Sequence, residues 1–412
     1  MIVEKERQIP VAGNYDVIVS GGGIAGIAAA LASARTGAKT LLIEKMFLLG
    51  GLATSGLITV YLPICDGNGT QVSFGLAEEL LRLSVKHGIE PTDSEVVHNP
   101  WLEDGTPEAR KKERFRVRFN GNLYAVLCEK LLEETGVDIL MGSSICSAAV
   151  EDGKITAVIT ENKSGRQAYT GKSFVDATGD ADLCWQAGED TVNFQQGNVW
   201  CTWFYEAGED GYKLHVLGTC DKPDKYKTPE ELANDTRTRY TGLDGKEISD
   251  MVCLTHSQML ESFLTRGGIG PNHALATVPT IPELRMTRRI DGLYAIHDTE
   301  KFKHFEDSIG MVSDWRKAGP VYELPFRCLY GREIRNLITC GRCISVTDDM
   351  WDITRVIPCC AVTGQAAGTA AAMSDDFAGL DVKLLQEKLR SDGVKLHLAD
   401  VGLSATWQSI NV

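Results

Sequence analysis

The sequence predicts an α/β fold built around a parallel sheet, and three observations predict it. Residues 15–20 form a short, mostly apolar run that is typical of a strand buried on both faces. A glycine-rich turn and an alanine-rich helix follow, and residues 40–43 supply a second strand that completes a βαβ unit. Further along, residues 173–177 form another apolar strand that ends in small polar residues. The 412 residues are enough for two domains or for one large domain with an insertion.

The turn after the first strand has the spacing G-x-G-x-x-G-x-x-x-A, at Gly21, Gly23, Gly26 and Ala30. The first glycine permits the tight bend, the second lets backbone N–H groups approach a pyrophosphate, and the third allows helix and strand to touch. Glu44 follows the second strand, 18 residues after Gly26, close to the ~20 expected of an acid that accepts hydrogen bonds from an adenosine ribose. Two other interpretations are a turn without a ligand and, because residues 17–34 carry no charge, a membrane span.

The composition is that of an ordinary globular protein, with 43% apolar and 24% charged residues. The formal net charge of -14 argues against nucleic acid or an acidic membrane as the main partner. The 12 cysteines show no regular disulfide framework, and the first residues carry charges where a signal peptide has an apolar run. We therefore expect a cytoplasmic enzyme with reduced thiols and a small-molecule substrate.

The rest of the chain alternates between regular and irregular stretches. Residues 49–56 form a second run of small residues, which lets backbone approach a flat ligand or else forms a flexible turn. Helices are predicted at 74–87 and 122–135, with a polar surface excursion or cap between them at 92–120. Strands are predicted at 137–140, 144–150, 155–160 and 166–170, and the last three resemble antiparallel strands inserted before the strand at 173–177.

Four segments resemble those of FAD-dependent oxidoreductases with the glutathione-reductase-type fold. They are the βαβ unit with Glu44, the GGLATSG run at 50–56, the FVDATGDAD strand at 174–182, and the C-terminal pieces CGRCIS at 340–345 and RVIPCCAVTGQAAG at 355–368. The second and the last are similar to the branch related to fumarate reductase flavoproteins. The resemblance implies a Rossmann-like FAD-binding domain formed by residues 1–190 and 331–412, with an inserted α+β substrate or cap domain at 191–330.

The resemblance also implies which residues border the FAD. They are Gly21, Gly23, Ile24, Ala25, Glu44, Lys45, Gly50, Gly51, Ala53, Thr54, Ile145, Ala177, Thr178, Gly179, Asp180, Gly341, Arg342, Gln365 and Ala366. The residues themselves suggest Thr363 as the N-cap of a helix that runs through Ala372. The positive end of that helix would favour negative charge on a reduced flavin, whereas the alternative is an ordinary buried helix.

Four residues are candidates for catalysis. Arg355 matches an arginine of the resembled family and is a candidate to hold an anionic substrate, or else to form an internal salt bridge with Asp349 or Asp352. Arg288 shares a predicted helix face with Arg285, and the two either clamp an anion or are solvated or paired with acids. The other two candidates are His273, as acid or base, and Cys360, beside Cys359; both can equally be structural.

We predict no metal site, because the C-x-x-C pair at Cys340 and Cys343 has no second pair and no H-x-x-x-H spacing occurs. The predicted function is that of an FAD-dependent oxidoreductase that transfers a hydride between a small organic substrate and the flavin. The alternatives are a dehydrogenase that holds NAD and a flavin or nucleotide binder without a redox role. The substrate, the electron acceptor or donor and the oligomeric state, homo-oligomer included, are open.

Overall fold

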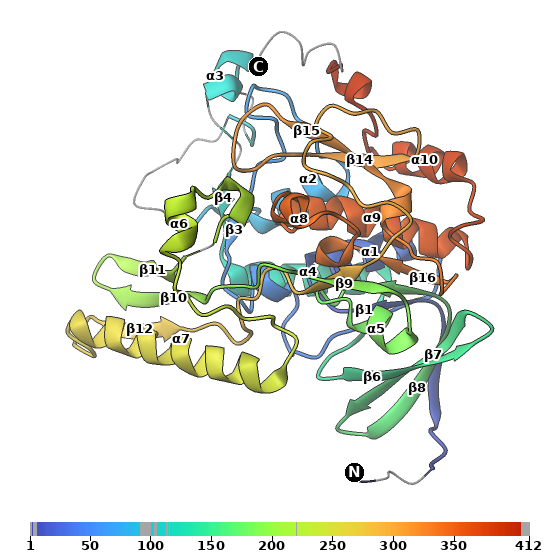
Figure 1. Ribbon diagram of the computed structural model, residues 1–412, viewed down its shortest axis with the longest axis horizontal. Helices are drawn as coiled ribbons and strands as arrows, with labels where there is room; N and C mark the ends of the chain where they lie inside the picture. The colour runs from blue at the N-terminus through green and yellow to red at the C-terminus, as the bar shows by residue number, and fades with distance from the viewer. Residues whose placement is uncertain are drawn as a thin grey trace.

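The computed structural model describes residues 2, 6–90, 100–102, 105–112, 114, 116–219 and 221–404. Its centre is a seven-stranded sheet with the order β5-β2-β1-β8-β7-β6, in which β16 also pairs with β8 (Figure 1). Strands β5, β2, β1, β8 and β16 run parallel, so the predicted α/β class with a mainly parallel sheet is confirmed. The strands are β1 Val11–Ser20, β2 Thr40–Ile43, β5 Asp138–Leu140, β6 Ser144–Glu151, β7 Lys154–Asn162, β8 Gly165–Asp176 and β16 Leu337–Thr339.

Strand β8 corrects the prediction of two separate strands at 166–170 and 173–177. The residues of β1 that precede the predicted strand, from Val11 on, pair with the first half of β8, and Tyr15 pairs with Gly171, so the chain stays extended where a break was predicted. On its other edge, the first half of β8 pairs antiparallel with β7 and its end pairs parallel with β16. One long strand therefore joins the antiparallel hairpin β6–β7 to the parallel sheet.

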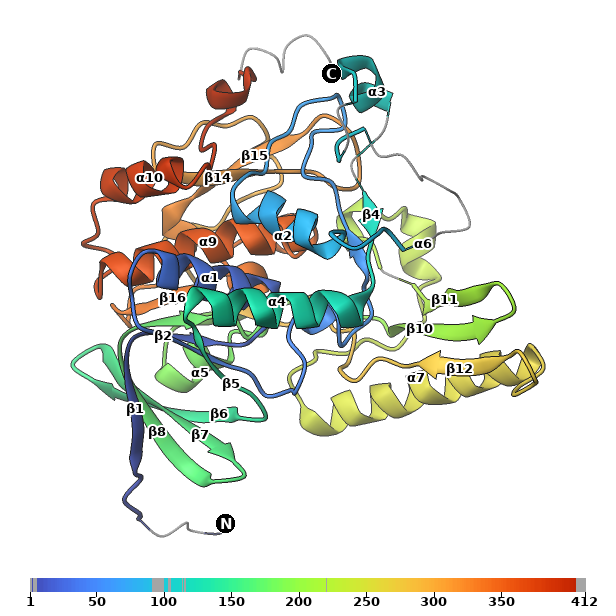
Figure 2. The same ribbon diagram turned by 180° about the vertical axis from the view of Figure 1, so that it is seen from behind.

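Helices cover both faces of the parallel strands, because residues along β1 are buried alternately on one side and the other. The short helix α5 (Asp182–Ala187) packs on one face, and α1 (Ile24–Arg35) lies on the other, where Figure 2 shows it among other helices. These are α2 Leu76–Ser84, α4 Gly121–Thr135, α9 Ile357–Met373 and α10 Val382–Ser391. Helices α1 and α9 touch through small residues: a Cβ on Gly368 would lie 2.0 Å from the carbonyl oxygen of Ala29. The Gly and Ala residues of α9 thus allow the two helices to pack closely.

Helix α9 begins seven residues earlier than predicted. Its N-cap is Val356, and Pro358 occupies the first turn, where the missing N–H is not needed. Thr363 is therefore not a cap: inside the helix, its hydroxyl donates to the carbonyl of Cys359 and accepts from the N–H of Gly341. The position of Pro358, rather than that of Thr363, indicates where the helix begins.

The segment 191–330 forms several smaller units. A three-stranded sheet, β11-β10-β12, carries the long helix α7, whereas β14 packs against α9 and α10 of the C-terminal part. The predicted domain boundaries stay a prediction. The remaining elements are β3 Val60–Tyr61, β4 Val117–Arg118, β9 Thr191–Asn193, β10 Cys201–Gly208, β11 Gly211–Gly218, β12 Ala274–Thr277, β13 Arg288–Ile290, β14 Ser308–Ser313, β15 Val321–Pro325, α3 Pro107–Lys112, α6 Pro229–Ala233, α7 Gly245–Thr265 and α8 Asp348–Thr354.

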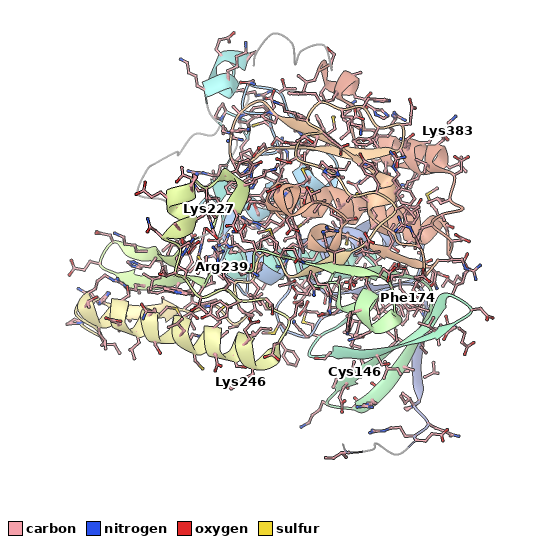
Figure 3. The ribbon with its side chains drawn as sticks, viewed as in Figure 1. Cys146, Phe174, Lys227, Arg239, Lys246 and Lys383 are labelled. Carbon is pink, nitrogen blue, oxygen red and sulfur yellow. The ribbon has the colours of Figure 1, made fainter. Side chains whose placement is uncertain are left out.

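The polar stretch at 221–246 is held by ion pairs. The ammonium of Lys227 contacts Asp221 and Asp235, and Arg239, which lies near Lys227 in Figure 3, pairs with both acids too. Burial alone raises the pKa of Asp221, but hydrogen bonds from Lys227, Arg239 and Arg237 outweigh it and lower the pKa to about 2. This cluster therefore fixes a loop that has little apolar surface of its own.

Three other expectations from the sequence can be compared with the fold. The stretch at 17–34 is a strand, a turn and a buried helix, so its interpretation as one membrane span is wrong. Among the described residues no single helix is long and apolar enough to cross a membrane, and only α8 and α9 together, bent by 91° at their junction, reach that length and composition. Of the predicted excursion at 92–120, residues 92–99, 103–104, 113 and 115 lie outside the described residues, and the described part contains α3 and β4.

Candidate functional site

The three glycines of the first turn differ in what surrounds them. Gly21 has a φ of 101°, and an added Cβ would lie 2.6 Å from the carbonyl oxygen of Ala177, the residue after β8. At Gly26 an added Cβ would lie 1.8 Å from the carbonyl oxygen of Gly21, so this glycine allows α1 to touch the turn. At Gly23 an added Cβ would meet no atom within 4 Å. Gly23 therefore faces open space at the N-terminus of α1, as a phosphate cradle requires.

Glu44 stands at the end of β2 and is only 8% exposed. Its carboxylate accepts hydrogen bonds from the backbone N–H of Gly22, at 2.6 Å, and of Met46, at 2.8 Å. Each oxygen of a carboxylate has a further lone pair. The acid is thus held beside the glycine turn with acceptor capacity to spare, as the ribose assignment requires.

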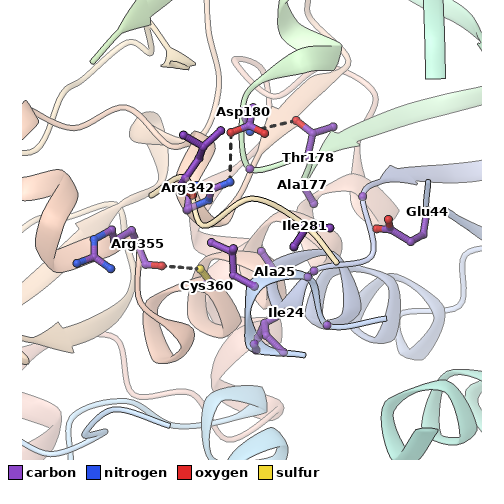
Figure 4. A pocket seen from close by; sticks show the side chains of 18 of the residues that line it. Ile24, Ala25, Glu44, Ala177, Thr178, Asp180, Ile281, Arg342, Arg355 and Cys360 are labelled. Atoms are coloured by element: carbon purple, nitrogen blue, oxygen red, sulfur yellow. Dashed lines mark hydrogen bonds and ion pairs between the residues drawn. The ribbon is translucent and has the colours of Figure 1, made fainter. Parts of the chain in front are cut away.

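A cleft runs from Glu44 past the glycine turn to Arg355, and Figure 4 shows these two side chains at opposite ends of it. We call it the nucleotide cleft. It brings together most of the residues predicted to border FAD, together with Arg355 and Cys360. The predicted residues in its wall are Gly21, Gly23, Ile24, Ala25, Glu44, Lys45, Gly50, Gly51, Ala53, Ala177, Thr178, Gly179, Asp180 and Arg342.

Five predicted FAD neighbours do not line this cleft. Ile145 borders a small adjoining pocket with Glu44 and Lys45. The other four support the wall from behind: the hydroxyl of Thr54 donates to the carbonyl of Leu49, Gln365 accepts from the N–H of Leu76 at 2.8 Å, Gly341 donates to Thr363, and Ala366 is fully buried. Their contribution to the site is to hold other residues in place.

Two of the candidate catalytic residues lie elsewhere. The shared helix face of Arg285 and Arg288 is wrong, because Arg288 begins strand β13 and Arg285 precedes it outside any helix. Arg288 pairs with Asp182 at 2.7 Å and donates to the carbonyl of Asp180, so it braces the turn after β8. His273 contacts Glu206 at 3.1 Å beside β10 and lines neither the nucleotide cleft nor the cavity described next.

A second cavity of about 320 Å³ adjoins the nucleotide cleft, and we call it the arginine cavity. The two share Leu52, Ala53, Arg342, Arg355 and Ile357. Its wall combines apolar and aromatic side chains with five arginines, and none of the described residues that line it is Asp or Glu. The other lining residues are Ile58, Val60, Leu62, Arg116, Arg118, Cys201, Trp203, Val216, Arg285, Trp315 and Val356.

Three of the five arginines in the cavity wall have acidic partners. Arg355 pairs with Asp352 at 2.7 Å, which realises one of the two salt bridges weighed from the sequence, and its guanidinium also lies 5.7 Å from the ring centre of Trp315. Arg342 pairs with Asp180 at 3.2 Å. Arg285 lies 3.4 Å from Glu283, a carboxyl group whose pKa burial raises to about 7, against the attraction of Arg285.

The N-terminus of α9 enters the wall between the two cavities through Ile357. A helix of 17 residues presents the positive end of its dipole and unpaired N–H groups there. Cys360, one turn further on, donates its S–H to the carbonyl of Arg355, and desolvation raises its pKa to about 12 even though Arg342 and Arg355 oppose the shift. Its thiol is therefore protonated at neutral pH, which argues against a thiolate nucleophile.

Several residues of the two walls were missed by sequence reasoning. In the nucleotide cleft these are Met46, Leu52, Ile281, Pro282, Leu284, Cys340 and Ile357. Leu52 lies inside the predicted GGLATSG run and could have been included, whereas residues 281–284 come from an irregular loop without a local signal. His304, Glu323 and His397 also gather, with ligand atoms within 4.8 Å of one another, but they line neither cavity.

The family model for FAD dependent oxidoreductases matches residues 16–200 and 193–389, which is most of the chain. The chain belongs to the FAD-dependent oxidoreductase family. This confirms the resemblance seen in the sequence and favours FAD over NAD as the dinucleotide. FAD is the cofactor of this family, and the protein is a flavin-dependent redox enzyme; the open cradle at Gly23 and the acceptor capacity of Glu44 fit that cofactor.

Individual relatives are more distant. The tRNA uridine 5-carboxymethylaminomethyl modification enzyme MnmG of Clostridium botulinum is 30% identical over 169 residues, which is 41% of this chain but only 24% of that enzyme. A geranylgeranyl bacteriochlorophyll reductase-like protein from Thermoplasma acidophilum is 15% identical, over 95% of this chain and 89% of that one, with a TM-score of 0.46. An open-conformation flavocytochrome c3 fumarate reductase is 14% identical, over 88% and 79%, with a TM-score of 0.43. Such likeness says nothing of the substrate.

Proposed function

We propose that this FAD-dependent oxidoreductase oxidises or reduces a small organic molecule bound in the arginine cavity. The observation that carries the proposal is the wall that the two cavities share, formed by Leu52, Ala53, Arg342, Arg355 and Ile357. A molecule in the arginine cavity touches the same side chains as the end of the nucleotide cleft farthest from Glu44. If Glu44 binds the adenosine ribose, that far end receives the flavin ring.

Different residues then bind the cofactor, stabilise charge and exclude water. Glu44 accepts hydrogen bonds from the ribose, and the N-terminus of α1 beside Gly23 holds the pyrophosphate. Bound FAD supplies the ability to accept or give two electrons as hydride. The N-terminus of α9 and the guanidinium groups of Arg342 and Arg355 favour negative charge at the shared wall. Apolar side chains such as Leu52 and Ile357 keep water away from it.

The proposal is tested by filling the arginine cavity without touching the nucleotide cleft. Val216 on β11 lines only this cavity, and because its side chain is 48% exposed, the fold can accept a larger residue. In Val216→Trp we expect FAD content and reduction by dithionite to stay normal. Anaerobic flavin reduction by the best compound of a small-molecule panel should fall tenfold or more, because the substrate has lost its space.

Val150→Trp is the matched control. Val150 lies on β6, is 38% exposed and lines neither cavity, so the same enlargement there should change neither flavin content nor reduction rate. A wild-type reduction rate in Val216→Trp would show that the substrate binds elsewhere. Protein that is colourless after gentle purification and takes up no FAD would contradict the assignment of the nucleotide cleft.

A further inference from the structure

The arginine cavity contains two buried donors that none of the described residues satisfies. Nη1 of Arg118, on β4, and Nε1 of Trp203, on β10, are both buried and have no hydrogen-bond partner among the described residues. The guanidinium of Arg118 lies 6.0 Å from the ring centre of Trp203, so the two groups are neighbours. Buried donors are nearly always paired, since an unpaired one costs about 1–3 kcal/mol. Two of them side by side in a cavity wall indicate that a ligand supplies the acceptor.

The charge around these donors is positive. Arg118 forms no ion pair among the described residues, in contrast to Arg342 and Arg355, which are paired with acids. Glu90 accepts a hydrogen bond from Tyr205, and burial raises the pKa of Glu90 although that hydrogen bond and the charge of Arg118 oppose the shift. Arg116 adds a second cation at an exposed place in the same wall. The ligand acceptor is therefore an anion.

The other residues of the cavity wall indicate the size and polarity of the rest of the ligand. Ile58, Val60, Leu62, Val216 and Trp315 are apolar or aromatic, and a volume of about 320 Å³ exceeds what a small diacid fills and lies in the range of sites for ring-sized ligands. One guanidinium N–H and one indole N–H match the two oxygens of a carboxylate, whereas a phosphate with three free oxygens calls for more donors.

We propose that Arg118 and Trp203 bind the carboxylate of the substrate, and that the substrate is a carboxylic acid with an apolar, ring-sized body. The inference rests on the proposed function, because it takes the arginine cavity as the substrate site. Both residues line that cavity but not the nucleotide cleft, so they hold the carboxylate away from the shared wall. The apolar body then extends toward Arg342, Arg355 and Ile357.

The test measures binding rather than turnover. FAD-loaded protein is titrated with benzoate, trans-cinnamate, 1-naphthoate and indole-3-acetate, each beside its neutral amide, and with phenyl phosphate; flavin absorbance and thermal shift report binding. We expect at least one acid to bind ten times or more tighter than its amide and tighter than the phosphate. In Arg118→Met this preference should disappear, in Arg118→Lys it should survive in part, and in Trp203→Phe, which keeps an aromatic ring but loses the indole N–H, it should weaken several-fold.

Arg82→Met is the control, because it removes the same charge at an exposed i,i+4 pair with Glu78 on α2. It should leave the acid preference intact. No preference for any acid over its amide, a stronger preference for the phosphate, or an unchanged preference in folded, FAD-loaded Arg118→Met would each overturn the inference. If the acids fail to bind while Val216→Trp still blocks substrate reduction, the proposed function stands and this inference fails. If they bind as expected but do not compete with the substrate, Arg118 and Trp203 bind a carboxylate that is not the substrate's, and the inference fails together with the proposed function.

Discussion

Replacing Gly23 by alanine separates cofactor binding from folding. The added Cβ would meet no protein atom within 4 Å, and the backbone of Gly23, at φ -68° and ψ 179°, suits any residue. Losing glycine at the N-cap costs roughly 0.5–1 kcal/mol, and the lower entropy of the unfolded chain returns about 0.4–1 kcal/mol. The free energy of unfolding of the apoprotein should therefore change by less than about 1 kcal/mol.

The cofactor is affected much more, because the Cβ enters the space through which a phosphate approaches α1. Loss of one hydrogen bond from a backbone N–H to a charged phosphate costs about 1.5–3 kcal/mol, which raises the Kd for FAD by about 10- to 100-fold. The assay is titration of apoprotein with FAD, followed by quenching of flavin fluorescence, with denaturant unfolding of the apoprotein in parallel.

Gly26→Ala is the matched variant, because its Cβ would lie 1.8 Å from the carbonyl oxygen of Gly21. It should destabilise the apoprotein by several kcal/mol, since backbone must move to relieve the contact. Unchanged FAD affinity in Gly23→Ala, or a loss of apoprotein stability as large as in Gly26→Ala, would refute the phosphate cradle.

Three further predictions concern residues in or beside the two cavities. Glu44→Gln keeps the shape but removes the charge, so FAD affinity should fall about tenfold in the same titration; an unchanged affinity contradicts the ribose assignment. Arg355→Met should slow substrate-driven flavin reduction about tenfold while Asp352→Asn has a smaller effect, whereas a lower melting temperature with a normal rate in both means that the ion pair is structural. The pKa of Glu283 is raised to about 7 in the fold, so the stabilisation by its protonated form is present near pH 4 and is lost as pH rises toward 7 and above. The melting temperature of the wild type should therefore fall over this pH range relative to that of Glu283→Gln. Parallel curves of melting temperature against pH for the two proteins would contradict this prediction.

Apart from the start of β1, which lies at Val11 and not at residue 15, the βαβ unit could be predicted closely because its signals are local. The strand at 40–43 has the predicted bounds, and Glu44 follows it at the glycine turn as expected. Steric needs of the turn fix glycine at Gly21 and Gly26, so the spacing in the sequence reports the geometry directly. Most residues of the nucleotide cleft could be predicted for the same reason, since most of them come from turns that directly follow parallel strands.

The errors arose where distant segments decide the structure. Strand β8 is continuous because the start of β1 pairs beside it, and nothing within residues 166–177 records that partner. Arg285 and Arg288 have a spacing of three, which also occurs in a helix, but pairing with β9 makes a strand of Arg288. The arginine cavity is the clearest case, because its five arginines come from parts of the chain as far apart as Arg116 and Arg355.

Arg355 and Arg118 show that the ion pairs of an arginine decide its attraction for an anionic ligand more than its sequence motif does. Arg355 was singled out because of its motif, and in the structure Asp352 already balances its charge and fixes its orientation. Arg118 belongs to a stretch interpreted as a surface excursion, yet its Nη1 is buried and has no hydrogen-bond partner in the part of the chain that the structure describes. A paired cation can orient a ligand, but its attraction for an anionic ligand is weaker because the acid partner already balances part of its charge. An unpaired buried cation gains a full charge-assisted hydrogen bond when an anion arrives, so in a protein with a net charge of -14 the specificity for an anion is expected to come mainly from Arg118.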